Sequence, residues 1–174
     1  VFTLARNRIV WLMVLMVSSM CTCGILSTYE AAFAAVPLLV TFIPMLTDTG
    51  GNAGSQASTM IIRSMTLGDI VPRDILRVLW KEFRVSLLCG FGLALVNYIR
   101  LVIMYPGQEG ICLVVSLSVM GTVIMSKTIG CTLPIVARCL HLDPTLMASP
   151  LITTIVDAAS LILYFQIASM LLPL

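Results

Sequence analysis

Charged residues are scarce in this chain, at 10% of 174 residues, whereas hydrophobic residues make up 59%. A soluble domain usually carries about 25% charged residues. The mean hydropathy of +1.07 also implies more apolar surface than one small core could hide. The composition therefore excludes an ordinary soluble domain and predicts a multi-pass protein of the cell membrane, embedded in the lipid bilayer. We expect neither a nucleic-acid partner nor an enzyme activity.

Histidine is equally scarce, and the cysteines do not have the spacing of a metal site. His141 is the single histidine, and we interpret it, beside Asp143, as an interfacial polar residue rather than a metal ligand. Cys21-x-Cys23 is followed by no second Cys or His pair with the spacing of a zinc site. Free cysteines usually behave as small hydrophobic residues, so we predict six small buried side chains in or beside apolar runs. These are Cys21, Cys23, Cys89, Cys112, Cys131 and Cys139.

Long apolar runs, in contrast, fill most of the chain. About 20 apolar residues cross the hydrocarbon of a bilayer, and five runs are long enough to do so. A cleaved signal peptide is the alternative for the first run, but residues 19–24 contain no clear small-x-small cleavage site. The expected fold is an all-α integral membrane protein with five transmembrane helices, in a single ion-transport domain over residues 1–174. The five runs cover residues 9–26, 31–62, 85–104, 111–140 and 145–172.

The second run is too long for a straight crossing. Pro37, Pro44 and the pair Gly50-Gly51 interrupt it, so we expect a kinked or broken helix. The third run is preceded by a charged amphipathic stretch, residues 73–84. That stretch fits an interfacial position in which long basic side chains reach toward water.

Lys and Arg are unevenly distributed between the two sides of these spans. Only Arg100 approaches one side, and Lys127 lies within a span. The basic side should be cytoplasmic, which places the N-terminus inside and the C-terminus outside. The residues on the basic side are Arg6, Arg8, Arg63, Arg73, Arg77, Lys81, Arg84 and Arg138.

One polar stretch, from Pro44 to Gln56, lies inside the second run. In lipid such a stretch is costly unless it faces protein or water. Asp48, Asn52 and Gln56 are spaced i, i+4, i+8 and therefore share one helix face. They could line a cation pathway, or they could form a helix interface held by amide hydrogen bonds, where nearby glycines allow close approach. We favour the pathway, because packing alone does not need a carboxylate.

A second polar stretch begins the fifth run. Ser149, Thr153 and Asp157 recur at helical spacing, and Ser160 and Tyr164 continue the same face. A carboxylate at this depth costs at least ~2.5 kcal/mol on insertion scales. Acids inside a membrane are functional by default, so we interpret Asp157 as a cation ligand in a wet pathway.

Lys127 is one positive charge within this expected cation path. It could form a structural ion pair that neutralises Asp48 or Asp157 in the cation-free state, which is the interpretation we favour. It could instead be a mobile counter-charge that leaves when a cation enters. A permanent pair with Asp157 would make that carboxylate structural rather than a ligand.

The donor set indicates which cation would be carried. Hard oxygens without a thiolate or His cluster favour Mg²⁺ or Ca²⁺ over Zn²⁺ or Cu⁺. Mg²⁺ gives up its waters reluctantly and often binds through one or two carboxylates. Two copies of Asp157 across a two-fold axis would neutralise one divalent ion, and two-fold dimers are the commonest oligomers. We therefore expect a homodimer that carries a hydrated divalent cation.

Two sequence patterns resemble the MgtE family of magnesium channels and transporters. The first is Pro44-x6-Gly51-Asn52-x-Gly54-x-Gln56, followed by Arg63. The second is Asp143-Pro144, then Pro150, then Thr154-x2-Asp157, then Tyr164-Phe165. Both patterns lie in expected spans, and the resemblance covers essentially all of the chain.

The resemblance implies Mg²⁺ transport by a homodimer whose pore lies at or near the subunit interface. It implies that Asp157 holds a hydrated Mg²⁺ and that Thr153 and Ser149 line the same path, one and two turns away. Asn52 falls within the first pattern, and Asp143 matches an acid near the cytoplasmic mouth. The predicted metal-binding residues are Asp157, Thr153, Ser149, Asp48, Asn52 and Asp143.

The chain also departs from the family pattern. The family's usual cytoplasmic N-terminal and CBS domains, with their connecting plug helix, do not occur in these 174 residues. We expect either an excised membrane domain or a chain with different regulation. Asp48 and Lys127 add charges that are not general to the family, so a Na⁺- or H⁺-coupled exchanger stays open beside a channel. A non-transporting membrane assembly subunit, whose polar stripes only hold helices together, is the rival interpretation.

Overall fold

The structure is a computed structural model that describes residues 2–70, 72–141, 144 and 150–172. Within these ranges the regular structure is entirely helical, which confirms the all-α prediction. The α-helices are α1 (Phe2–Thr28), α2 (Glu30–Ala35), α3 (Ile43–Leu67), α4 (Ile75–Met104), α5 (Glu109–Cys139) and α6 (Pro150–Leu171). Two short 3₁₀ helices, η1 (Pro37–Phe42) and η2 (Pro72–Asp74), precede α3 and α4.

Three helices, α4, α5 and α6, are long and apolar enough to cross a membrane. They correspond to the third, fourth and fifth apolar runs of the sequence. In α1 the described apolar segment is the shorter Leu12–Thr28. Helix α3 has the length of a span, at 25 residues, but carries a stripe of polar side chains. For α1 and α3, a membrane crossing stays a prediction.

The long second run of the sequence is divided in the structure. Helix α2 ends at Ala35, η1 starts at Pro37, and α3 continues from Ile43 to Leu67. Pro44 lies in the first turn of α3, where its missing N–H costs no helical hydrogen bond. The helix continues through Gly50-Gly51 without a change of type. The change from α to 3₁₀ geometry thus falls at Pro37, not at the glycines.

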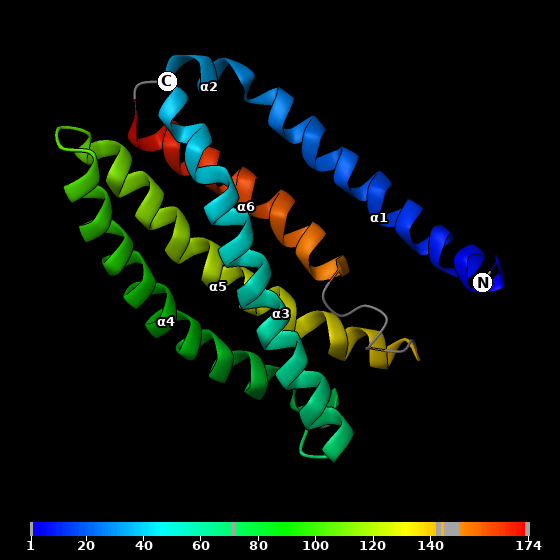
Figure 1. Ribbon diagram of the computed structural model, residues 1–174. Coiled ribbons are helices and arrows are strands. Elements are labelled where there is room, and N and C mark those ends of the chain that lie inside the picture. Colours follow the sequence, from blue (N-terminus) through cyan, green and yellow to red (C-terminus); the bar gives the residue numbers. More distant parts are fainter. Residues whose placement is uncertain (1, 71, 142–143, 145–149, 173–174) are drawn as a thin grey trace.

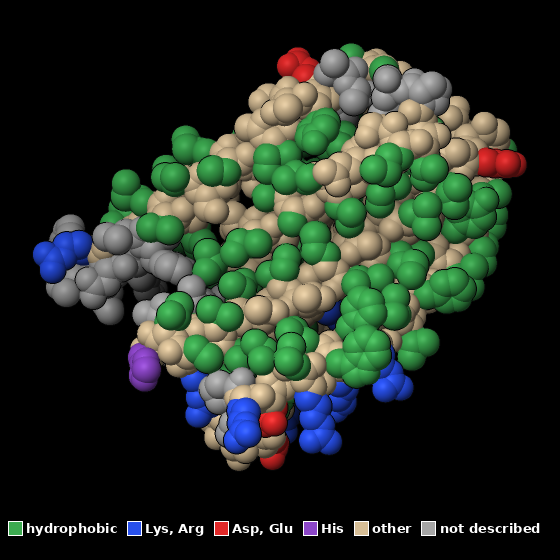
Figure 2. All heavy atoms as spheres, turned by 180° about the vertical axis from the view of Figure 1, so that it is seen from behind, with side chains coloured by type: hydrophobic (Ala, Val, Ile, Leu, Met, Phe, Trp, Pro, Cys, Tyr) green, Lys and Arg blue, Asp and Glu red, His purple; other side chains and the backbone are tan. Residues whose placement is uncertain are grey.

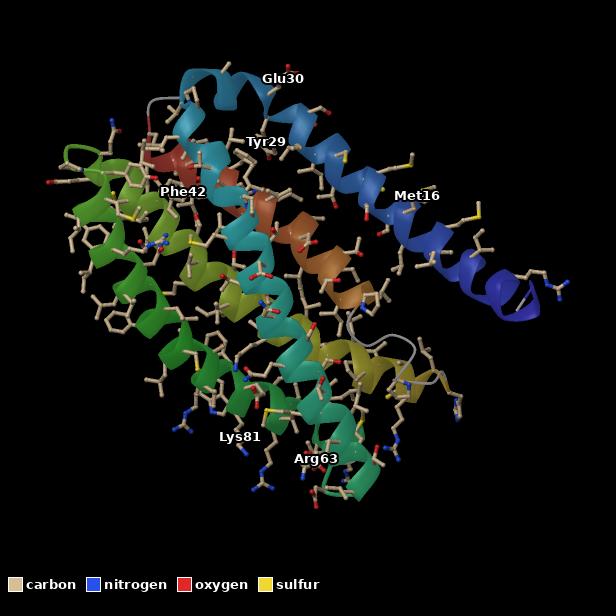
Figure 3. All side chains as sticks on the ribbon, in the orientation of Figure 1. Met16, Tyr29, Glu30, Phe42, Arg63 and Lys81 are labelled. Carbon is tan, nitrogen blue, oxygen red and sulfur yellow. The ribbon has the colours of Figure 1, made fainter. Side chains whose placement is uncertain are left out.

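Helix α5 is the centre of the bundle and packs against α3, α4 and α6 (Figure 1). Helix α3 crosses over α5 and α6, while α4 runs beside α5. Helix α1 packs chiefly on α6, and Figure 1 shows its N-terminal half leading away from the other helices. Met16 points away from the bundle in Figure 3 and is exposed. The polar stretches of α3 and α6 therefore meet on a bundle organised around α5.

A hydrophobic cluster fixes the position of α6 beneath η1. The Tyr164 hydroxyl donates a hydrogen bond of 2.9 Å to the Leu39 carbonyl oxygen, and both residues are buried. The Phe165 ring stacks on Tyr29 with ring centroids 4.3 Å apart. Phe42 and Tyr29 both lie at the end of the bundle where Glu30 is found (Figure 3). These contacts fix the position of α6 along its axis relative to η1 and the start of α3.

Replacing Tyr164 with Phe should lower the free energy of unfolding by about 1–2 kcal/mol, because the buried Leu39 carbonyl loses its donor. Thermal unfolding in detergent would measure the change. Tyr98→Phe is the matched control, since no hydrogen bond from the Tyr98 hydroxyl to another described residue occurs, and it should change stability by less than about 0.5 kcal/mol. Equal effects of both substitutions would contradict the role given to the Tyr164 hydroxyl.

The cysteine prediction is only partly right. Cys112 and Cys131 are buried, whereas the other four lie exposed on outer helix faces of this single chain. The apolar runs predicted burial, but they do not distinguish a face covered by another helix from a face covered by lipid. All six are free thiols: Cys21, Cys23, Cys89, Cys112, Cys131 and Cys139.

Candidate cation site between helices α3 and α6

Two different faces of α3 decide where its polar side chains go. Gly50 and Gly54 are buried against α5 and α6, and a Cβ at Gly50 would lie 2.8 Å from a Val156 methyl carbon. Because the face of α3 that carries the glycines packs against α5 and α6, residues on the opposite face point away from these helices. Asp48 and Asn52 are exposed on that outward face, and Gln56 follows one turn later. The predicted polar stripe is therefore present on α3.

The polar face predicted for α6 is shorter in the structure than in the sequence analysis. Thr153 and Asp157 are half-buried and reach a hollow. Ser160 and Tyr164 are fully buried instead. The Ser160 hydroxyl donates to the Val156 carbonyl at 2.6 Å, so it satisfies its own helix. The two residues keep the predicted helical spacing, but η1 and α5 cover this part of α6, so Ser160 and Tyr164 do not line the hollow.

A hollow of about 280 Å³ lies where α3 and α6 approach each other. The approach is close because position 51 has no side chain: a Cβ on Gly51 would lie 3.2 Å from the Thr153 methyl carbon. The hollow brings together four of the six predicted metal-binding residues. Ser149 and Asp143 lie outside the described residues. The lining consists of Thr47, Asp48, Gly51, Asn52, Thr153 and Asp157.

Thr47 is a lining residue that sequence reasoning missed. Its hydroxyl donates to the carbonyl oxygens of Ile43 and Pro44, at 3.1 and 3.2 Å. With its proton held by the backbone, the hydroxyl oxygen presents lone pairs as acceptors. Thr47 and Gly51 are spaced i, i+4 and lie directly beside the Asp48 and Asn52 pair. This spacing, one residue before the Asp48 and Asn52 pair, could have predicted that Thr47 lies beside the polar stripe.

The donor set of the hollow consists of oxygen ligands for a hard cation. Carboxylates, hydroxyls and an amide line it, and the described residues contain no cluster of three or more His, Cys, Asp or Glu side chains able to hold a metal. One chain thus offers too few charged ligands to replace a hydration shell. Six waters, at about 30 Å³ each, need about 180 Å³, which the hollow can hold. The arrangement suits a cation that keeps its water.

A larger cavity lies on the other side of the α3 stripe. Its volume is about 760 Å³, and it is an open cleft lined by residues of α3, α4 and α5. Asp48 and Asn52 line both this cavity and the hollow. Lys127 from α5 lines the larger cavity, with 7% of its surface exposed. It forms no ion pair or hydrogen bond with any residue in the described ranges, so a pair with Asp48 or Asp157 is absent there.

Basic side chains are concentrated at one end of the bundle. Figure 2 shows most of the visible Lys and Arg side chains gathered at one end. Arg63 and Lys81 lie at that end, and Glu30 lies at the opposite one (Figure 3). The hollow and the larger cavity are both lined by residues 47–56, mostly in the N-terminal half of α3.

Comparison with known proteins gives consistent matches. The family model MgtE, described as a divalent cation transporter, matches residues 43–167, which include α3, α4, α5 and most of α6. A magnesium transporter MgtE from Thermus thermophilus is 36% identical over 97% of this chain, and one from Bacillus subtilis is 31% identical over 97%. The chain spans 37% of the length of each of these relatives. Together with its apolar helices, the match identifies a multi-pass membrane protein, and the chain belongs to the MgtE family of divalent cation transporters.

Proposed function

We propose that this chain transports Mg²⁺ across the membrane through a pore at a homodimer interface, with hydrated Mg²⁺ held by Asp157 of both chains. The observation that supports this most is the hollow in which Asp157 and Asp48 face one space. The choice of Mg²⁺ is supported by the relatives described as magnesium transporters. Mg²⁺ is the substrate here and not a resident cofactor.

The outward face of α3 supports the dimer. Asp48 and Asn52 are exposed in the single chain, and in hydrocarbon their polar groups would each lack a partner. A second copy seated over the hollow would enclose these groups together with water. Two Asp157 carboxylates would then face one ion, which matches the charge of a divalent cation.

The electrostatics of such a pore favour a hydrated divalent ion. Each chain contributes a carboxylate from α3 and another from α6 to the same hollow. Mg²⁺ retains several waters when it binds proteins, so contacts through its hydration shell are sufficient. Ser149 and Asp143 would continue the path toward the cytoplasmic mouth.

For the membrane topology we propose five crossings per chain, the second broken before α3. The basic end of the bundle, with Arg63 and Lys81, would lie in the cytoplasm. The N-terminus would then be inside and the C-terminus outside. Cysteine accessibility on each side of sealed vesicles would measure this directly, with Cys139 near the basic end as a natural probe.

Uptake of Mg²⁺ into proteoliposomes tests the function. We expect flux well above that of empty vesicles, in the presence and absence of a Na⁺ gradient. Flux no higher than in empty vesicles would favour a non-transporting assembly subunit. Flux that requires the gradient would favour a Na⁺-coupled exchanger, which is the second candidate because Asp48 and Lys127 line one cavity.

Replacing Asp48 with Asn separates the two transport mechanisms. We expect Mg²⁺ flux to fall about fivefold, equivalent to about 1 kcal/mol, because the hollow loses one of its two charges. Folding should be retained, since Asn is nearly isosteric with Asp. A channel would show this loss equally at all Na⁺ concentrations and pH values. A variant in which Na⁺ or pH dependence changes would instead favour a coupled exchanger.

A further inference from the structure

Lys127 is unusual among the basic residues of this chain. It is buried in the middle of α5, and its side chain lines the cavity of about 760 Å³ between α3, α4 and α5. Within the described part of the chain its ammonium group has no ion-pair or hydrogen-bond partner. A buried charge without compensation is costly, so a use for this one must be sought in the cavity itself.

The walls of the cavity separate into an apolar and a polar side. Helix α4 contributes the apolar side, through Leu88, Leu93 and Val96. Helix α3 contributes Asp48, Asn52 and Gln56, whose oxygen atoms are the acceptors. A carboxylate and two amides facing an apolar wall form an environment that attracts a small cation. The ammonium of Lys127 is a cation already present in that environment.

The shared position of Asp48 gives this arrangement a consequence for ion binding. Asp48 also lines the smaller hollow with Asp157. An ion in the larger cavity would draw on the same carboxylate that faces the hollow. The Lys127 ammonium is covalently attached to α5, so it supplies positive charge on that side of α3 and, unlike a free ion, cannot leave for the solvent.

We propose that Lys127 is a tethered cation whose charge, in the same cavity as Asp48, keeps Na⁺ out of that larger cavity. The proposal rests on the proposed function of Mg²⁺ transport. If Lys127 excludes Na⁺, that transport does not use Na⁺ as a coupling ion. The proposal assigns Lys127 a role in ion specificity, not in holding Mg²⁺. Removing the ammonium should allow a small monovalent cation to enter the cavity and bind, with Asp48, Asn52 and Gln56 as ligands.

Lys127→Met tests the proposal, because Met keeps most of the side-chain length and removes the charge. The melting temperature of the purified protein in detergent is measured in NaCl and in N-methyl-D-glucamine chloride at equal ionic strength, without Mg²⁺. We expect no difference between the salts for the unaltered protein. For the variant we expect a saturable rise of about 5 °C or more at a Na⁺ concentration about 100 times the Kd. Binding of radioactive Na⁺ to the variant should saturate over the same range.

Three further variants make the result specific. Lys127→Arg keeps a charge in the cavity and should stay insensitive to Na⁺. Lys81→Met removes a lysine at the exposed start of α4 and should also stay insensitive. Combining Lys127→Met with Asp48→Asn should abolish the response, because the carboxylate that attracts Na⁺ is gone. Na⁺ sensitivity of the unaltered protein, or none in Lys127→Met, would overturn the proposal.

Failure to fold is itself informative in this design. If Lys127→Met is recovered only when Na⁺ is present, the ion has replaced the ammonium and the proposal is supported. If Lys127→Met and Lys127→Gln both aggregate in every salt while Lys127→Arg is soluble, the ammonium serves folding alone and the proposal is overturned. The Na⁺ measurements need no Mg²⁺ flux, so they are distinguishable from a failure of the transport function.

Discussion

Mg²⁺ binding and transport should fall about 100-fold, equivalent to about 2.7 kcal/mol, when Asp157 is replaced by Asn. Truncating one member of a close charge pair commonly has an effect of this size. In the proposed dimer both chains lose a full charge at one ion. Asn is nearly isosteric and can form hydrogen bonds, so the fold should persist. Isothermal titration with Mg²⁺ and flux into proteoliposomes would measure the two losses.

The controls for this substitution follow from the chemistry of the carboxylate. Asp157→Glu keeps the charge but moves it by one methylene, so partial loss is expected. Asp69→Asn removes the same charge just beyond the end of α3, away from the hollow, and should leave Mg²⁺ binding unchanged. Cobalt hexaammine should compete with Mg²⁺, because it resembles the hexahydrated ion. Normal transport by a well-folded Asp157→Asn protein would remove Asp157 from the pore and make its role structural.

Gly130→Ala should lower the free energy of unfolding by about 3 kcal/mol or more, the upper range for overpacking. A Cβ at Gly130 of α5 would fall on the Gly54 carbonyl of α3, and backbone cannot move aside as a flexible side chain can. The helices would have to separate at the crossing that positions the α3 stripe. Thermal unfolding in detergent would measure the loss, and Mg²⁺ binding should weaken with it.

Gly24→Ala in α1 is the matched control for that substitution. A Cβ there would have no atom within 4 Å, and Ala favours a helix over Gly by about 1 kcal/mol. Its melting temperature should be unchanged or slightly raised. If Gly130→Ala melted at the same temperature as Gly24→Ala, the close approach of α3 to α5 would not be a constraint on the fold.

Helical periodicity explains which parts of the site could be predicted. The spacing of Asp48 and Asn52, and that of Thr153 and Asp157, places each pair on one face of its own helix whatever surrounds it. Local geometry alone was therefore sufficient to choose them. That the two pairs meet in one hollow depends on how α3 crosses α6, and the sequence indicated this only through glycines that allow close approach.

What covers each face of a helix could not be predicted from the sequence. Ser160 and Tyr164 share a face with Asp157 by spacing, yet neighbouring helices bury them. Cys89 lies in an apolar run, yet it is exposed at the wall of a cavity. In a chain that is apolar on nearly every side, hydrophobicity does not distinguish protein neighbours from lipid, so burial cannot be deduced from it.

The two cavities on either side of α3 share Asp48 and Asn52. The helix is thus a thin partition whose polar atoms belong to both compartments at once. Binding in the two compartments is therefore coupled. A cation that engages these oxygens from the larger cavity would weaken divalent binding in the hollow by some factor. A divalent ion in the hollow would weaken the binding of that cation by the same factor.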